Sequence, residues 1–152
     1  MNYLDRIEEQ EKNDYDIVCR IYSALCEDCT VLNEQNPMFS HIDMRTSAIT
    51  EEKVYVWDTE IKNINPKHDK FIIKVDKFIS MLQESKGLLY ICFLQGDFAY
   101  IYNVRKLNIK ELDKGYITAN KCEYEPSQGQ NKQLHIFLPK DKAYRVIDLC
   151  QL

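Results

Sequence analysis

The segment Val54–Lys62, with the sequence VYVWDTEIK, constrains the fold of this chain more than any other stretch. Its β-branched and aromatic residues are typical of a β-strand. Because side chains alternate between the two faces of a strand, Asp58, Glu60 and Lys62 share one face, whereas Trp57 lies on the other. The segment therefore predicts a strand with an apolar face and, near its end, a row of charged groups on the opposite face.

A second strand is predicted just upstream, at His41–Ser47, and it carries Asp43. The polar residues Thr50–Lys53 lie between the two predicted strands and are typical of a turn. Two strands joined by so short a connection are expected to form an antiparallel hairpin. Such a hairpin would bring Asp43 towards the charged residues at the end of Val54–Lys62.

Downstream, the sequence predicts a helix followed by a buried strand. Within Ile72–Gln83 the apolar residues recur at helical spacing, and Gly87 follows where a helix commonly ends. Leu88–Leu94 is almost wholly apolar, as expected of a central strand that is buried on both faces. A strand, a helix and a buried strand in this order form a crossover unit. The sequence therefore predicts an α/β (α+β) fold with a mixed central sheet flanked by helices.

Further elements are predicted at the two ends of the chain, and we expect one domain over residues 1–152. Helical spacing of apolar residues predicts a helix over Tyr15–Leu25 with Asn13 or Asp14 as its N-cap, and residues 3–11 could begin it earlier. Shorter strands are predicted at residues 30–32, 98–104, 116–117, 134–138 and 144–147.

Composition narrows the class of protein. With 45% hydrophobic and 29% charged residues the chain is expected to be globular, and no apolar run reaches the ~18 residues of a membrane span. The polar start lacks the apolar core of a signal peptide, so we expect a cytoplasmic protein without a membrane partner. The net charge of −4 disfavours nucleic acid, yet residues 1–52 carry 12 acidic and 4 basic side chains, whereas residues 53–114 carry 8 and 11.

Six cysteines raise the question of disulfides or a metal site: Cys19, Cys26, Cys29, Cys92, Cys122 and Cys150. Without a sign of secretion, reduced thiols are expected. Cys26 and Cys29 form a lone Cys-x-x-Cys. A structural zinc site usually requires a second pair of ligands at short spacing, which this sequence lacks. Buried small hydrophobic residues are therefore the favoured interpretation over zinc.

The charged residues of the predicted hairpin suggest a specific chemistry. Phosphodiester hydrolysis needs an activated water and stabilisation of the phosphoryl oxygens, both of which Mg²⁺ or Mn²⁺ can supply. Asp43 and Glu60 could converge on one ion, with the backbone carbonyl of Ile61 as a third ligand. Lys62 could orient or deprotonate water, or stabilise charge on the phosphate.

These residues resemble the motif of the PD-(D/E)XK nuclease superfamily: Asp43, followed at a strand end by Glu60-Ile61-Lys62. The superfamily has a restriction-endonuclease-like core with the order α-β-β-β-α-β, which the predicted elements follow over residues 13–104, with residues 105–152 adding strands that complete the domain. The residue before Asp43 is Ile42 rather than proline. The resemblance implies that Asp43 and Glu60 bind the metal and that Lys62 assists the attacking water.

Several accessory residues follow from the same resemblance. Many members add an acidic residue from the first helix, for which Asp16 or Glu27 is available, and some add Gln or Lys from the helix after the motif, for which Lys74, Lys77 and Gln83 are available. Asp58 shares the face of Glu60 and is either a metal or water ligand or an exposed carboxylate.

The function that the resemblance implies is a Mg²⁺-dependent endonuclease acting on nucleic acid, most simply DNA, in repair, recombination or defence. A domain this small that cuts both strands of a duplex would act as a homodimer. The alternative is an inactive nuclease-like module that binds a protein or nucleic-acid partner, and a third interpretation is an α+β protein of unrelated function. Metal binding by Asp43 and Glu60 separates the first two, and a large distance between these residues would indicate the third.

Overall fold

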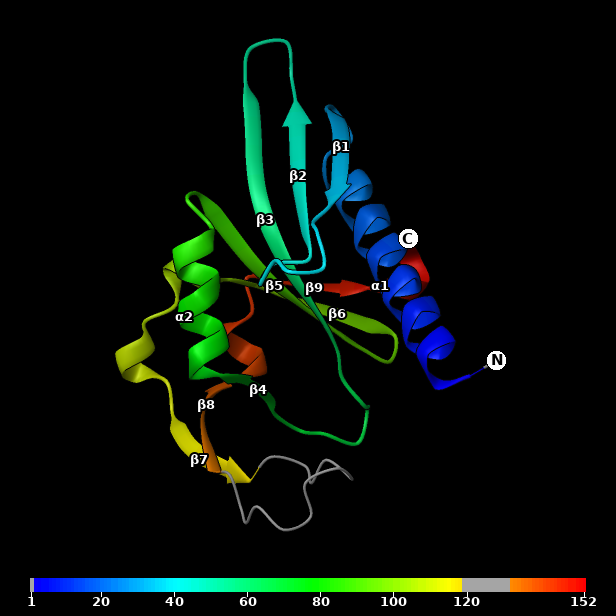
Figure 1. Ribbon diagram of the computed structural model, residues 1–152. Helices are drawn as coiled ribbons and strands as arrows, with labels where there is room; N and C mark the ends of the chain where they lie inside the picture. Colours follow the sequence, from blue (N-terminus) through cyan, green and yellow to red (C-terminus); the bar gives the residue numbers. More distant parts are fainter. Residues whose placement is uncertain (1, 119–131) are drawn as a thin grey trace.

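A mixed six-stranded sheet forms the centre of the fold (Figure 1). The computed structural model describes residues 2–118 and 132–152. The strands of the sheet lie in the order β1 (Thr30–Gln35), β2 (Met44–Ile49), β3 (Val54–Asn63), β5 (Leu88–Gln95), β6 (Phe98–Asn103) and β9 (Arg145–Asp148). β3 and β5 run parallel, whereas the other neighbours pair antiparallel. The predicted mixed central sheet is confirmed.

The crossover from β3 to β5 contains the second helix, α2 (Val75–Glu84), and a strand, β4 (Phe71–Lys74). The prediction that the helix begins at Ile72 is wrong. β4 instead pairs with β8 (Lys132–Leu138), which also pairs with β7 (Lys114–Thr118) to form a second sheet in the order β4-β8-β7. The main-chain bonds of this ladder hold residues 71–74 extended, so the helix starts where the ladder stops.

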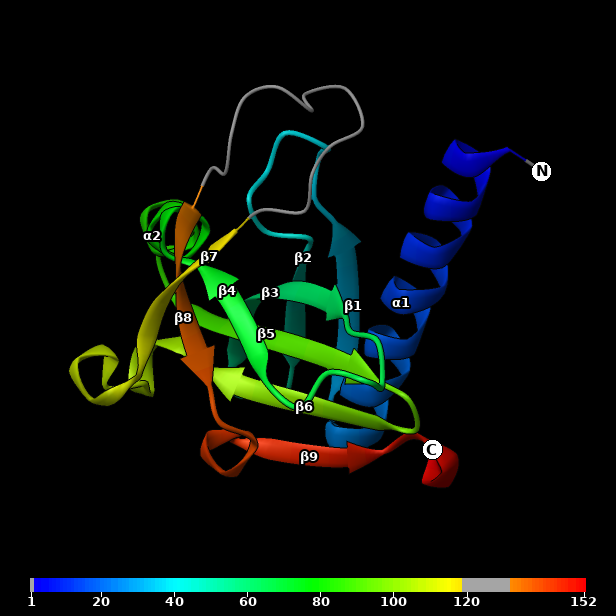
Figure 2. The same ribbon diagram turned by 90° about the horizontal axis from the view of Figure 1, so that it is seen from below.

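The first helix, α1 (Tyr3–Leu25), covers the face of the central sheet opposite α2 and the small sheet (Figure 2). Its N-cap is Asn2, which forms a capping box with Asp5, so the prediction of a cap at Asn13 or Asp14 is wrong. Residues 3–13 are exposed and show no apolar stripe, which is why apolar periodicity predicts the helix only from Tyr15. Asp14 lies in the interior of α1 rather than at its start, and its side chain is buried.

The boundaries of the first hairpin also differ from the prediction. β2 begins at Met44 rather than His41, because residues 36–42 form a loop that is tied by its own hydrogen bonds and by Glu84 of α2. Asp43 therefore lies directly before β2. β1 is longer than predicted and pairs over its whole length with β2.

Two apolar clusters lie on the two faces of the central sheet. One contains Phe78 and Met81 of α2 with Phe71 and Phe93, and the other contains Val18 and Ile21 of α1. Four short 3₁₀ helices complete the described elements: η1 (Val104–Lys106), η2 (Ile109–Glu111), η3 (Lys140–Lys142) and η4 (Leu149–Gln151). Over residues 2–118 and 132–152, no helix combines the length and the apolar character that crossing a membrane requires.

Candidate active site

Asp43 and Glu60 lie side by side at the end of the β2–β3 ladder, and we call them the carboxylate pair. The register places Met44 opposite Thr59, so Asp43 stands opposite Glu60, and opposite residues of an antiparallel pair share a face. The backbone N–H of Asp43 donates to the carbonyl of Thr59 at 3.2 Å. The next bond of the ladder runs from the Ile61 N–H to Oδ2 of Asp43, at 2.6 Å. The Asp43 side chain thus continues the ladder one step beyond β2.

Glu60 is a buried carboxyl group, with only 5% of the residue exposed. Its pKa is raised to about 8 by burial first and by the neighbouring Asp43 carboxylate second, with Lys77 acting in the opposite direction. Nζ of Lys77 lies 2.8 Å from Oε2 of Glu60. Oε2 is buried, and its charge is balanced by this ammonium group.

The carboxylate pair opens onto a polar cavity of about 250 Å³. Its wall is formed by α1, β1, β3 and the segment directly before β2. The lining residues are Glu11, Asp14, Tyr15, Gln35, Asp43, Glu60, Ile61 and Lys62. Lys62 follows Glu60 by two residues on β3, so both side chains leave the strand on the same face. An ammonium group and two carboxyl groups therefore share one cavity, as the spacing along the sequence predicts.

The two acidic residues that α1 contributes are Glu11 and Asp14, and the sequence interpretation missed both as site residues. Oδ1 of Asp14 accepts hydrogen bonds from Nε2 of Gln10 at 2.9 Å and from Nδ2 of Asn63 at 3.0 Å. The bond from Asn63 connects α1 to the end of β3. Asp14 lies four residues before the buried Val18, in the stripe by which α1 contacts the sheet, a spacing that predicts burial of Asp14 but not its place at the cavity.

The proposed accessory residues divide into those near the cavity and those elsewhere. Lys77 contacts Glu60 directly. Asp16 is exposed on α1, two residues and hence about 200° around the helix from Asp14. Glu27 lies beyond α1, beside the turn between β2 and β3, at the opposite end of that hairpin from Glu60.

The remaining accessory candidates also lie outside the cavity. Asp58 is buried and forms an ion pair with Arg45 on the neighbouring strand, with 2.9 Å between Nε and Oδ1. Lys74 ends β4 and is exposed, and Gln83 is exposed in the last turn of α2. The structure therefore brings Asp43, Glu60 and Lys62 together with Lys77, and leaves Asp58, Lys74 and Gln83 apart from them.

The donor set fits a divalent ion of the magnesium type. Within residues 2–118 and 132–152, no three His, Cys, Asp or Glu side chains are close enough to bind one ion together. Mg²⁺ does not require such a cluster, because it is commonly held by one or two carboxylates with water and substrate phosphate as further ligands. Oε2 of Glu60 already has a cationic neighbour, Nζ of Lys77 at 2.8 Å, so a divalent ion at this carboxylate would share or replace that contact.

The cysteines of the described residues show no metal site. Cys19, Cys26 and Cys29 are half-buried and not disulfide-bonded, and Cys122 lies outside the described residues. Burial raises the pKa of the Cys19 and Cys26 thiols. No group of three His, Cys, Asp or Glu side chains that could hold one ion occurs among the described residues.

Comparisons with known proteins concern the arrangement of the elements. The sequence matches no protein-family model and no curated protein. Among solved structures, the chain is similar to Hjc, a Holliday junction resolvase from the archaeal hyperthermophile Archaeoglobus fulgidus. The TM-score is 0.45 with 8% sequence identity, over 87% of this chain and 88% of that chain. The chemistry of the site therefore has to be derived from its own side chains.

Proposed function

We propose that this chain is a metal-dependent nuclease of the PD-(D/E)XK type that hydrolyses phosphodiester bonds, with DNA as its substrate. The observation that carries the proposal is the carboxylate pair, in which Asp43 and Glu60 stand opposite each other at a strand end. Lys62 lines the same cavity. Two carboxylates and an ammonium group in one cavity supply what metal-assisted phosphodiester hydrolysis requires of a protein.

Each residue of the cavity has a distinct role in this proposal. Asp43 and Glu60 hold the ion, and the backbone carbonyl of Ile61 is the third protein ligand. When bound, Mg²⁺ or Mn²⁺ supplies positive charge beside the scissile phosphate and lowers the pKa of bound water. Lys62 donates hydrogen bonds from its ammonium group to the attacking water or to a phosphate oxygen.

Lys77 has a supporting role in the metal-free protein. Its ammonium group lies 2.8 Å from Glu60 and favours the ionised form of that carboxyl group. Glu60 must lose its proton before it binds a cation. Lys77 lowers the pKa of Glu60 relative to the effect of burial alone, and so makes this loss easier. We therefore propose Lys77 as a positioning residue rather than a ligand.

Calorimetric titration with Mn²⁺ tests the proposal, with wild type compared with Glu60→Gln and Asp58→Asn. Asp58 is a matched control, because it is a buried carboxylate on the same strand that is already paired with Arg45. We expect saturable binding in wild type and in Asp58→Asn, and loss of binding in Glu60→Gln. An unchanged isotherm in Glu60→Gln would overturn the assignment of the metal site.

Cleavage is tested in the same set of proteins together with Lys62→Met. Substrates are duplex, branched and single-stranded DNA and single-stranded RNA, each with Mg²⁺ or Mn²⁺. We expect Lys62→Met to bind Mn²⁺ but to cleave at least about a hundredfold more slowly, as is typical when a group that stabilises the transition state is removed. Cleavage at the wild-type rate by both Glu60→Gln and Lys62→Met would contradict the proposal.

The hydrogen bond from Ile61 to Asp43 favours one alternative, an inactive module that keeps the fold and binds a partner. This bond extends the β2–β3 ladder, and it would serve that structural role in a protein without catalysis. The two functions differ in their response to the cation. An inactive module binds its partner equally well in a chelator and in Mg²⁺, and shows no Mn²⁺ isotherm that depends on Glu60.

A further inference from the structure

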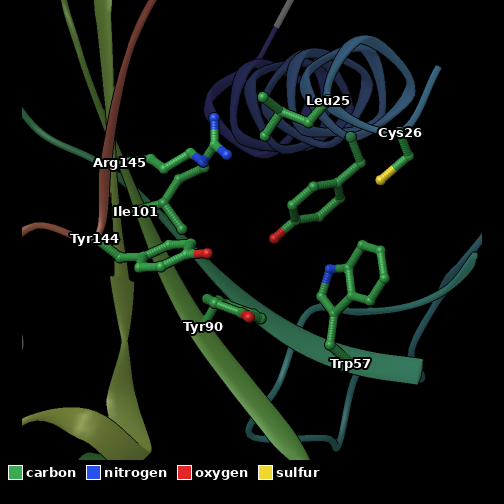
Figure 3. A pocket seen from close by; sticks show the side chains of 8 residues that line it. Leu25, Cys26, Trp57, Tyr90, Ile101, Tyr144 and Arg145 are labelled. Carbon is green, nitrogen blue, oxygen red and sulfur yellow. The ribbon is translucent and has the colours of Figure 1, made fainter. Parts of the chain in front are cut away.

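A second cavity lies on the α1 side of the central sheet, between the end of α1 and the strands β3, β5, β6 and β9 (Figure 3). Its volume is about 190 Å³. It is therefore large enough for a planar ring system and too small for a folded segment of a partner.

Four of the eight residues that line the cavity are aromatic. Trp57 packs edge-to-face on Tyr22, with ring centroids 5.2 Å apart, and Tyr90 lies 6.1 Å from Tyr144. In Figure 3 the rings of Trp57, Tyr90 and Tyr144 surround one open space. Flat aromatic walls favour a flat ligand, because stacking maximises the contact between two planar faces.

The polar atoms of the aromatic wall are covered inside the protein. The indole N–H of Trp57 has almost no accessible surface and lies beside the Tyr22 hydroxyl. That hydroxyl is bonded to Oγ1 of Thr59, at 2.5 Å. A ligand in the cavity therefore meets the ring surfaces of Trp57 and Tyr22 rather than their polar atoms.

Arg145 supplies a positive charge beside these rings. Its guanidinium lies 6.0 Å from the centroid of the Tyr144 ring, and the residue is exposed. Within residues 2–118 and 132–152 the ion pairs are those of Arg45 and Lys77, so Arg145 has no carboxylate partner there. A planar guanidinium without such a partner is suited to a phosphate group.

We propose that this cavity binds one nucleotide, with the base among the aromatic rings and the phosphate on Arg145. A nucleotide matches two features of the wall, since its flat ring fits the aromatic side chains and its anionic group fits the guanidinium of Arg145. The cavity is separate from the carboxylate pair: Trp57 and Glu60 leave β3 on opposite faces, and Tyr22 lies about 12 Å along α1 from Asp14. The proposal therefore does not depend on nuclease activity.

Trp57 provides a direct readout, because it is the only tryptophan of the chain. The wild-type protein is titrated with the four nucleoside monophosphates, the corresponding nucleosides and inorganic phosphate, by tryptophan fluorescence and by calorimetry. We expect saturable quenching by at least one monophosphate, weaker binding of its nucleoside and no quenching by phosphate. Phosphate that binds as tightly as every monophosphate would overturn the proposal, because it would indicate an anion site only.

Three variants locate the binding site. We expect Arg145→Gln to weaken monophosphate binding about tenfold or more and to leave nucleoside binding unchanged, since one charge-assisted contact is lost. Tyr144→Ala should weaken the binding of both ligands. Arg20→Gln removes an equal charge from an exposed position of α1 outside the cavity and should change neither. An equal loss in Arg20→Gln and Arg145→Gln would overturn the assignment.

The nucleotide could arrive free or as the end of a nucleic-acid strand, and a further arm distinguishes the two sources. A short 5′-phosphorylated DNA strand is titrated into Glu60→Gln and into Glu60→Gln with Arg145→Gln. If only the DNA strand quenches the fluorescence, and if this quenching depends on Arg145, the source is the end of a nucleic-acid strand. If the monophosphates quench the fluorescence, the source is the free nucleotide. Absence of saturable binding of every monophosphate and of the strand would refute the proposal, whatever the outcome for metal binding.

Discussion

Glu60 is a buried carboxyl group with a second carboxyl group as its neighbour. Burial and Asp43 together raise the pKa of Glu60 to about 8 against the effect of Lys77, so the metal-free protein favours a proton at this site near neutral pH. A divalent cation would replace that proton. Protonation and metal binding are thus competing ways to neutralise the same buried charge.

This competition predicts how stability depends on pH. The folded pKa of Glu60, about 8, lies above the ordinary value of 4.5, so the folded state binds this proton more tightly than the unfolded state. The stabilisation is complete below about pH 4.5 and is lost as the pH rises through about 8. We expect the free energy of unfolding of wild type to fall over this range relative to Glu60→Gln, as measured by urea denaturation in a chelator. Parallel pH profiles for the two proteins would contradict this expectation.

The residues of the site could be predicted from sequence only where one strand or one hairpin fixes their geometry. Alternation along β3 places Glu60 and Lys62 together, and the short connection to β2 brings Asp43 opposite Glu60. Glu11 and Asp14 come from a helix whose rotation about its axis depends on tertiary packing. Their position at the cavity could therefore not be derived from local spacing.

Among the elements, α2 acts on the site from outside the hairpin, because it places Lys77 on Glu60 while its buried residues fix the helix on the sheet. Its start differs from the prediction for a reason that lies far along the chain. Ile72 and Ile73 fit both a helical and an extended pattern, and the strand β8 that makes them extended lies about 60 residues later in the chain. Local periodicity cannot reveal so distant a partner.

Truncation of the α2 core residue Phe78 tests this dependence. Phe78 is only 1% exposed and lies in the same cluster as Met81, so Phe78→Ala should cost about 3–5 kcal/mol of unfolding free energy. Ile79, the next residue, is 46% exposed, and Ile79→Ala should cost less than about 1 kcal/mol. Urea denaturation of the two variants checks the difference. Similar losses would show that α2 does not pack on the sheet through Phe78.

For the molecule as a whole, the uneven distribution of charge matters more than the net charge of −4. Acidic residues are concentrated in residues 1–52, and α1, with Glu11 and Asp14, forms one wall of the polar cavity. Phosphate groups that approach the carboxylate pair therefore meet negative charge unless a cation is present.

DNA binding is accordingly expected to require a divalent cation. We expect Ca²⁺ or Mg²⁺ to raise the affinity for a DNA strand at least about tenfold over a chelator at equal ionic strength, since the cation removes a repulsion between like charges. Glu60→Gln should lose most of this increase, and Asp58→Asn should keep it. Fluorescence anisotropy with labelled DNA measures the affinities. An affinity that is independent of divalent cations would show that the carboxylate pair does not face the nucleic acid.

The position of β9 in the sheet has a consequence for the order in which the two cavities form. The polar cavity is built from residues 11–62, on a strand that needs only β2 and β5 as neighbours, whereas the aromatic cavity needs Tyr144 and Arg145 beside β6. During synthesis, which proceeds from the N-terminus, the carboxylate pair can therefore assemble on the ribosome before the residues that complete the aromatic cavity have been translated.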